Sequence, residues 1–107
     1  MVALTILESV RLYLKKVNEN GIPVKFGVIF GSQARGVADK DSDIDLLVVS
    51  PHFDGKKDQS ETTLLWELTI GTDSRVEPVP VGEQEWIEDD SRAIVEIARR
   101  EGLIVEI

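Results

Sequence analysis

Residues 31–50 read GSQARGVADKDSDIDLLVVS. A glycine and a serine follow the apolar run VKFGVIF (residues 24–30), a polar loop comes next, and an acidic cluster leads into a second apolar run, DIDLLVVS (residues 43–50). Both runs have the length and the valine content of β-strands. Aspartates at the mouth of a strand that is otherwise apolar are costly to bury, so the stretch raises the question of what they bind.

The two aspartates of D-x-D share one face of the predicted strand 43–50. Side chains at positions i and i+2 point to the same side of a strand, so Asp43 and Asp45 lie together with their Cα atoms roughly 7 Å apart. Both faces become apolar further along, which predicts a strand that is covered on both sides. Two unpaired carboxylates repel each other and are costly to desolvate, whereas a divalent cation removes both penalties.

A further strand is predicted at RVEPVPV (residues 75–81). Pro78 and Pro80 are two residues apart, so their missing N–H donors lie on one side of the strand and the other side stays free to pair. This pattern predicts an edge strand. Glu77 stands near the start of one of its faces, in a place that an apolar residue would be expected to fill.

The acidic starts of these strands can form one site. If strands 43–50 and 75–81 are neighbours, Asp43, Asp45 and Glu77 converge on one patch, and a patch of carboxylate oxygens suits Mg²⁺ or Mn²⁺. A plainer interpretation stays open: D-x-D is common, the aspartates of a solvated loop often cap turns, and a single glutamate on a strand usually faces solvent.

The pair Gly31-Ser32 has the features of a phosphate-binding turn. Gly31 ends the strand of residues 24–30 and lets the backbone come close to a ligand. Ser32 offers a hydroxyl, and the N–H groups of the short SQARG turn can face a phosphate as a helix N-terminus does. Such a pair alone is more often an ordinary loop, so its spacing to the aspartates carries the argument.

The N-terminal part of the chain predicts a helix over about residues 3–19 that ends at Asn20-Gly21. Its apolar residues recur at three- and four-residue steps and form one stripe, made of Leu4, Leu7, Val10, Leu14 and Val17. A polar loop is expected over residues 51–60. A second helix is expected over about 60–70, closed near Gly71. Whether Trp66 of this helix, or Trp86 further on, lines the core or a partner surface is left open.

A last helix is predicted after Ser91, which can cap it, and Gly102 is expected to end it in the left-handed conformation. Its expected core face consists of Ala93, Ile94, Ile97 and Ala98. LIVEI (residues 103–107) is expected as a final strand. The order helix, strand, strand, helix, strand, helix, strand predicts an α/β (α+β) domain, with a small mixed sheet of about four strands and flanking helices.

The composition sets limits on the class of protein. A chain of 107 residues is expected to form one domain, residues 1–107. The formal net charge of −8 argues against non-specific nucleic-acid binding, which rests on a broad basic face. The chain has no cysteine, and its apolar runs are far shorter than a bilayer requires, so we expect a cytoplasmic protein without a membrane segment.

Taken together, these residues resemble a known family. Gly31-Ser32, ten further residues and Asp43-Ile44-Asp45 reproduce the G-S-x10-D-x-D signature of the DNA polymerase beta-like nucleotidyltransferase superfamily. The fuller text GSQARGVADKDSDIDLLV resembles the minimal nucleotidyltransferases, in which G-S-x-A-R-G and S-D-I-D-L recur. The preceding helix, the loop and the later acidic strand also match, so the resemblance covers nearly the whole chain and implies the polymerase beta-like nucleotidyltransferase fold.

The resemblance implies roles for five of these residues. Gly31 and Ser32 would hold the β- and γ-phosphates of a nucleoside triphosphate. Asp43 and Asp45 would ligate two Mg²⁺ (or Mn²⁺) ions. Glu77 would be the third carboxylate, binding metal and drawing the proton from the attacking hydroxyl, although the family more often has aspartate there.

Arg35 lies on the same turn, where it could contact phosphate and be part of the nucleotide-binding set. A structural ion pair with Asp41 or Asp45 is an equally good interpretation. Asp41 is also the first substitute if Glu77 is not the third ligand.

The resemblance implies a metal-dependent transfer of AMP (or another NMP) from ATP to a hydroxyl. Small members of this kind are often paired with a helical HEPN-type protein and act as its antitoxin by adenylylating a tyrosine of the toxin. One alternative is a catalytically idle antitoxin that acts by contact alone, and another is a nucleotide-sensing regulatory domain. The acceptor, the preferred base and an oligomer of the chain itself are left open.

Overall fold

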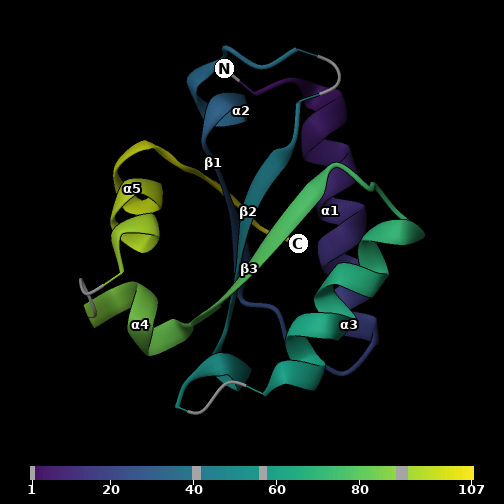
Figure 1. Ribbon diagram of the computed structural model, residues 1–107, viewed down its shortest axis with the longest axis vertical. Coiled ribbons are helices and arrows are strands. Elements are labelled where there is room, and N and C mark those ends of the chain that lie inside the picture. Colours follow the sequence, from purple (N-terminus) through teal and green to yellow (C-terminus); the bar gives the residue numbers. More distant parts are fainter. Residues whose placement is uncertain (1, 40–41, 56–57, 89–91) are drawn as a thin grey trace.

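The computed structural model describes residues 2–39, 42–55, 58–88 and 92–107 (Figure 1). The helices in this part are α1 (Leu4–Glu19), α2 (Ser32–Arg35), the 3-10 turn η1 (Pro51–Phe53), α3 (Gln59–Ile70), α4 (Glu83–Glu88) and α5 (Ala93–Glu101). The strands are β1 (Phe26–Phe30), β2 (Ile44–Ser50), β3 (Val76–Gly82) and β4 (Leu103–Val105). The predicted mixed α/β fold with four strands is confirmed.

The strands form one sheet in the order β3-β2-β1-β4. Strand β1 is antiparallel to both of its neighbours, whereas β2 and β3 run parallel. The Ile44 N–H donates to the Arg75 carbonyl at 2.8 Å, so the backbone groups of residue 75 and of every second residue after it face β2. Pro78 and Pro80 therefore turn their missing donors outward, and the predicted edge strand is confirmed.

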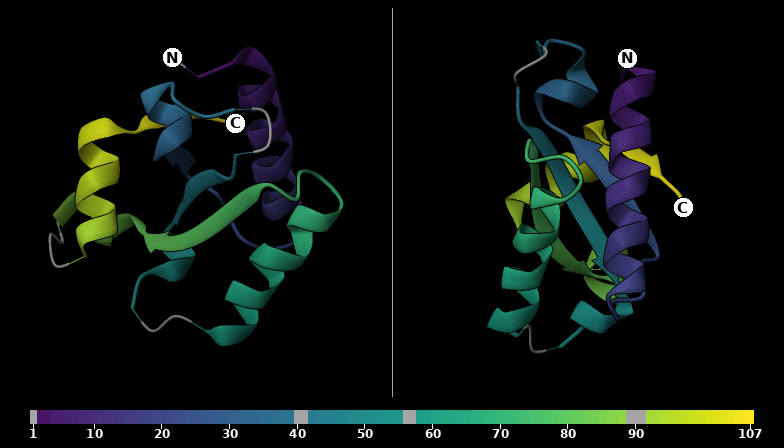
Figure 2. Two further views of the ribbon diagram at one scale, coloured as in Figure 1. Left: turned by 45° about the horizontal axis from the view of Figure 1, so that its top comes forward. Right: turned by 90° about the vertical axis from the view of Figure 1, so that its right-hand side faces the viewer.

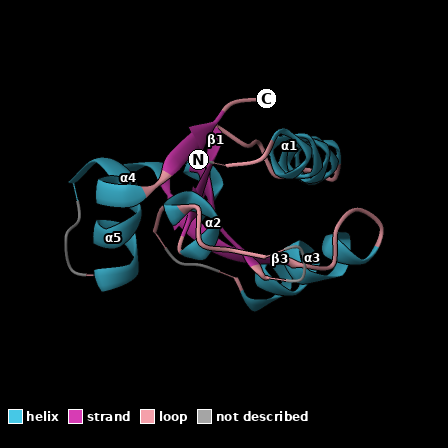
Figure 3. Ribbon diagram, turned by 90° about the horizontal axis from the view of Figure 1, so that it is seen from above, coloured by secondary structure: helices cyan, strands magenta, loops and turns pink. Residues whose placement is uncertain are grey.

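The sheet is covered on both faces, as its two-sided apolar strands require (Figure 3). Helices α1 and α3 lie on one face, and α4 and α5 lie on the other. Figure 2 shows α1 and α3 next to each other in front of the sheet. The buried side chains divide accordingly. Ile29, Ile44, Leu46 and Val48 belong to the α1/α3 cluster, and Val28, Phe30, Leu47 and Val49 belong to the α4/α5 cluster.

The expected stripe of α1 is largely confirmed. Val10, Leu14 and Val17 are buried, but Leu4 is 66% exposed, because the buried face is turned toward Ile6 and Tyr13. The helix ends as predicted, at Asn20 with Gly21 at a positive φ of 95°. In the described part of the chain, no helix has both the length and the apolarity needed to cross a membrane.

The expected core face of α5 is wrong in part. The residues that face the sheet are Ile94, Val95 and Ala98, whereas Ala93 is exposed and Ile97 is 41% exposed. Two overlapping stripes fit the same helical period, and packing against β1 selects the one that contains Val95.

The expected left-handed cap at Gly102 is also wrong. Gly102 has φ −77° and ψ 160°, because the chain passes directly into β4 at Leu103. The lack of a side chain matters here for space, since a Cβ would collide with the Ala98 carbonyl and with Val28. Ser91, the expected cap of this helix, lies outside the described residues.

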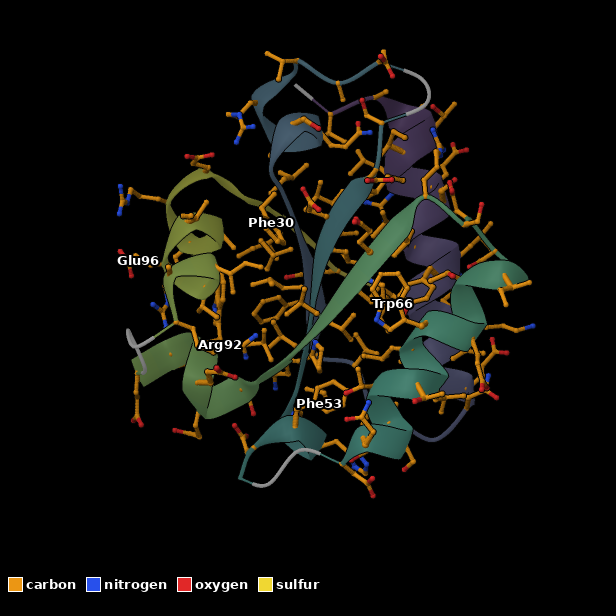
Figure 4. All side chains as sticks on the ribbon, in the orientation of Figure 1. Phe30, Phe53, Trp66, Arg92 and Glu96 are labelled. Carbon is orange, nitrogen blue, oxygen red and sulfur yellow. The ribbon has the colours of Figure 1, made fainter. Side chains whose placement is uncertain are left out.

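Helix α4 was not expected from the sequence. It is joined to α5 by Arg99, whose Nε and Nη2 donate to the carbonyls of Trp86 and Glu85 at 2.6 and 2.7 Å. Trp86 packs edge-on against Phe26, with ring centroids 5.7 Å apart, and so lines the α4/α5 core. Trp66 on α3 is 47% exposed and is labelled in Figure 4.

Candidate functional site

The candidate residues gather at one end of the sheet, where β1 ends and β2 and β3 begin. Helix α2 lies at this end, in the connection from β1 to β2 (Figure 2). Asp45 pairs with Phe30 of β1 on one side and with Glu77 of β3 on the other. The parallel register of β2 and β3 therefore places these two acidic residues directly beside each other, as the alternation of the sequence predicts.

Gly31 is fixed in this place by its conformation and by its neighbour. Its φ of 73° with ψ of −148° lies in the region that favours glycine. A Cβ at this position would also collide with the carboxylate of Asp45. The backbone that follows β1 thus comes close to the D-x-D carboxylate because residue 31 has no side chain.

The SQARG segment forms a short helical turn. The Arg35 N–H donates to the Gly31 carbonyl, and the Val37 N–H donates to the Ser32 carbonyl, both at 3.1 Å. Gly36 ends the turn in the left-handed conformation. The turn leaves Ser32 half-buried immediately after Gly31.

The three carboxylates lie within electrostatic range of one another. Desolvation raises the pKa of Glu77, and the charges of Asp43 and Asp45 and a hydrogen bond with Asp43 raise it further. Desolvation also raises the pKa of Asp45, with a second contribution from the charge of Asp43, while the charge of Arg35 acts in the opposite direction. Both pKa values are therefore raised first by burial of the charged form and then by the other carboxylates nearby.

Within the described residues, no group of three or more His, Cys, Asp and Glu side chains is already arranged to hold a metal ion. The three carboxylates are therefore close enough to repel one another without showing a finished coordination geometry. As a donor set they still fit Mg²⁺ or Mn²⁺, because all their ligand atoms are oxygens and their mutual repulsion is what a divalent cation would relieve.

Arg35 makes a contact that the sequence did not indicate. Its Nη1 donates to Oε2 of Glu101, at the end of α5, at 3.4 Å, and both side chains are substantially exposed. The charge of Arg35 acts to lower the pKa of Asp45, but the ion pair of Arg35 is with Glu101. Asp41, the other acid considered as a partner of Arg35 and as a substitute ligand, lies outside the described residues.

Gln33 is a second residue of this region to which the sequence analysis gave no role. It is the variable position of G-S-x-A-R-G, and the structure buries it at 7% exposure between α2 and the start of β2. Gln33 lies inside the motif, but no pattern in the sequence indicated that its side chain would be buried.

Residues 10–102 match the protein family described as the nucleotidyltransferase domain. No curated protein matches the sequence. Solved structures that are similar in fold include these two. One is a protein from Sulfolobus solfataricus, provisionally assigned as a nucleotidyltransferase. It has a TM-score of 0.65 and 19% identity, over 94% of this chain and 79% of that one.

The other is a toxin-antitoxin structure with AMP-PNP, which has a TM-score of 0.60 and 20% identity, over 89% of this chain and 71% of that one. At such identities the two structures establish the fold alone, whereas the family match spans most of the sequence. The chain belongs to the nucleotidyltransferase domain family.

Proposed function

We propose that the protein is a metal-dependent adenylyltransferase that moves AMP from ATP to a hydroxyl of a HEPN-type partner toxin and thereby acts as its antitoxin. One observation carries the proposal: the parallel register places Glu77 beside Asp45, at the point where Gly31 brings the backbone against the Asp45 carboxylate. Family membership supports nucleotidyl transfer. The toxin-antitoxin structure with AMP-PNP supports the choice of an adenine nucleotide and a protein partner.

Each residue has a task in this reaction. Asp43, Asp45 and Glu77 would hold Mg²⁺, which would balance the charge that builds up on the attacking and leaving oxygens at the α-phosphorus. Glu77 would also accept the proton of the attacking hydroxyl. Gly31 and Ser32 would face the departing pyrophosphate with backbone N–H groups and a hydroxyl, and Arg35 would add a positive charge at the same turn.

A catalytically idle antitoxin is the second candidate, and residue 77 favours it to a degree. The resembling family more often has aspartate there, and glutamate is longer by one methylene. Such a protein would keep the nucleotide site and the partner surface and neutralise the toxin by contact alone. A purely contact-based role predicts tight binding of the partner without any covalent change.

The reaction can be tested with ATP that carries a radioactive label in one phosphate. The partner to test is a short helical protein of the HEPN type, to be sought in the reading frame next to the one for this chain. It is mixed with the purified protein and Mg²⁺. Label from the α-phosphate should become covalently attached to the partner, and label from the γ-phosphate should not. Transfer of the γ-label would instead indicate a kinase-like reaction, and binding without transfer of either label would favour the idle antitoxin.

A further inference from the structure

Gln33 differs from the other buried polar side chains of the described residues. Apart from tyrosine, three such side chains are buried: Gln33, Ser50 and Thr69. Ser50 accepts from the His52 N–H at 3.0 Å and Thr69 donates to the Trp66 carbonyl at 2.7 Å, so both serve their own segment. The amide of Gln33 instead reaches nine and ten residues along the chain, to the carbonyls of Ser42 at 3.4 Å and Asp43 at 3.5 Å.

The chemistry of the contact fixes the orientation of the amide. Carbonyl oxygens only accept hydrogen bonds, so Nε2 of Gln33 must face the two carbonyls. A buried amide that lost these partners would carry a desolvation cost, and so would the carbonyls it leaves. The side chain therefore stabilises one particular path of the backbone through Ser42 and Asp43.

That path is the approach to the D-x-D motif. Strand β2 begins at Ile44, whose N–H is held by the Arg75 carbonyl at 2.8 Å, so Asp43 lies just before the first ladder bond. Ser42 is in turn tied to Asp39, because its N–H donates to the Asp39 carbonyl at 3.2 Å. Gln33 holds the segment between these two points, from a residue of the turn that follows Gly31.

We infer that Gln33 is a positioning residue, which holds the backbone of Asp43 at a fixed distance from the Gly31-Ser32 turn. This inference rests on the proposed function and deepens it. Because Asp43 is exposed, the position of its carboxylate depends mainly on the position of its backbone. The same amide spans the turn proposed for phosphate and the aspartate proposed for metal, so both parts of the site keep one geometry.

The test compares Gln33→Met, which keeps the length of the side chain and removes the donor, with Gln33→Glu, which keeps the shape and turns an acceptor toward the two carbonyls. Gln84→Met is the matched control, because Gln84 is exposed on α4 and its backbone N–H, which the substitution keeps, donates to Oδ1 of Asp54. Mn²⁺ affinity is measured by electron paramagnetic resonance, and kcat and the KM for ATP are measured with the α-label. Circular dichroism reports the folded fraction.

Contacts that orient metal ligands are worth on the order of 10–100-fold in metal affinity or activity. Both Gln33 variants should therefore bind Mn²⁺ about 10–100-fold more weakly and lose kcat by a similar factor, with Gln33→Glu the worse of the two. Gln84→Met should match the wild type. If folded Gln33→Met and Gln33→Glu bind Mn²⁺ within twofold of the wild type, the positioning role is wrong. Mn²⁺ affinity can be measured without the hydroxyl-bearing substrate of the proposed transfer. If the wild type transfers no AMP but the Gln33 variants still bind Mn²⁺ more weakly than the wild type, the proposed transfer is wrong and the role of Gln33 stands.

Discussion

Two acidic groups at the same end of the sheet have opposite environments. Asp73, just before β3, accepts three hydrogen bonds from Arg75: Nη2 donates to Oδ2 at 2.7 Å, and Nε and the backbone N–H donate to Oδ1 at 3.0 Å. Those contacts, the side-chain bonds foremost, lower the pKa of Asp73. Glu77, four residues later, has Asp43 and Asp45 as its charged neighbours, and its pKa is raised.

The difference separates an acid that completes the fold from acids that the fold leaves unbalanced. The negative charge of Asp73 is balanced by Arg75, and their hydrogen bonds fix the turn into β3. Asp45 and Glu77 interrupt the face that continues as the α4/α5 core, and desolvation makes the largest contribution to both of their raised pKa values. Such an arrangement does not stabilise the fold and is typical of a ligand-binding site.

The largest expected effect follows from removing one of the unbalanced charges. Asp43→Asn or Asp45→Asn should lower turnover by roughly a thousandfold or more, because each metal contact stabilises the transition state by several kcal/mol. The free energy of unfolding without metal should stay the same or rise, since a repulsion is relieved. Turnover is measured with the α-label and unfolding with urea. A variant that keeps near-wild-type turnover would remove that aspartate from the site.

Glu77 is the next position in expected size. Glu77→Gln should lower turnover by roughly a hundredfold if the side chain holds metal or takes the proton of the hydroxyl. Glu77→Asp shortens the side chain but restores the residue more common in the resembling family, so part of the activity should survive. Single-turnover rates with both variants decide the point. Near-wild-type rates in Glu77→Gln would make Glu77 an ordinary strand residue and would direct the search for a third ligand to Asp41.

Asp73 should behave in the opposite way. Asp73→Asn keeps the shape but weakens three charge-assisted hydrogen bonds, and should cost about 1–2 kcal/mol of stability at neutral pH. Turnover per folded molecule should change by less than about twofold, a small effect beside the metal contacts. The comparison requires the urea midpoint and the turnover of the same preparation. A loss of turnover at full stability would mean that Asp73 also serves the site.

The two kinds of acid also predict opposite pH dependences without metal. The pKa of Asp73 is lowered, so its contribution to stability is present above its ordinary value of 3.8 and is lost as the pH falls through the lowered value. The pKa values of Asp45 and Glu77 are raised above 3.8 and 4.5, so their contribution is present below those values and is lost as the pH rises through the raised ones. Above about pH 4, the wild type should therefore lose stability relative to Asp45→Asn as the pH rises.

Urea unfolding in EDTA over this range measures the difference between wild type and variant. Mg²⁺ with ATP should remove the difference and raise the Tm of the wild type by linkage, but not that of Asp43→Asn. A constant difference between wild type and Asp45→Asn from pH 4 to 7 would show that the carboxylates are already balanced within the protein.

Much of this comparison could be predicted from the sequence, because it follows from the period of a strand. The alternation in DIDLLVVS and RVEPVPV gives the faces of β2 and β3, and the two prolines give the edge. The adjacency of Asp45 and Glu77 then needs only that the strands be neighbours. Gly31 could be identified because it ends the strand of residues 24–30 and belongs to the same motif as Asp45. The structure gives it a positive φ and a close approach to the Asp45 carboxylate.

The parts that were missed depend on contacts across the fold. The bonds of Gln33 and the pairing of Arg35 with Glu101 join residues whose distance no local pattern encodes. The buried face of α5 could not be chosen from its sequence, because Ile94 and Ala98 belong to both candidate stripes. Helix α4 is short and is held by Arg99 from the following helix, so its own residues gave little signal.

The smallest expected effect concerns Arg35, whose positive charge acts both on Glu101 and on Asp45. Its guanidinium pairs with Glu101 and is also felt by Asp45, so Glu101 competes with any phosphate for the same group. An exposed pair of this kind is worth at most about 1 kcal/mol. Glu101→Gln should therefore lower the KM for ATP by about twofold at low salt, with kcat unchanged, and the difference should fade at high salt. Arg35→Gln should raise the KM for ATP. In that background Glu101→Gln should no longer change the KM, because there is no Arg35 charge for which Glu101 and phosphate compete. Steady-state kinetics of the two single variants and the double variant measure this coupling. If Glu101→Gln lowers the KM equally with and without Arg35, the effect comes from the overall negative charge of the chain, and Arg35 only links α2 to α5.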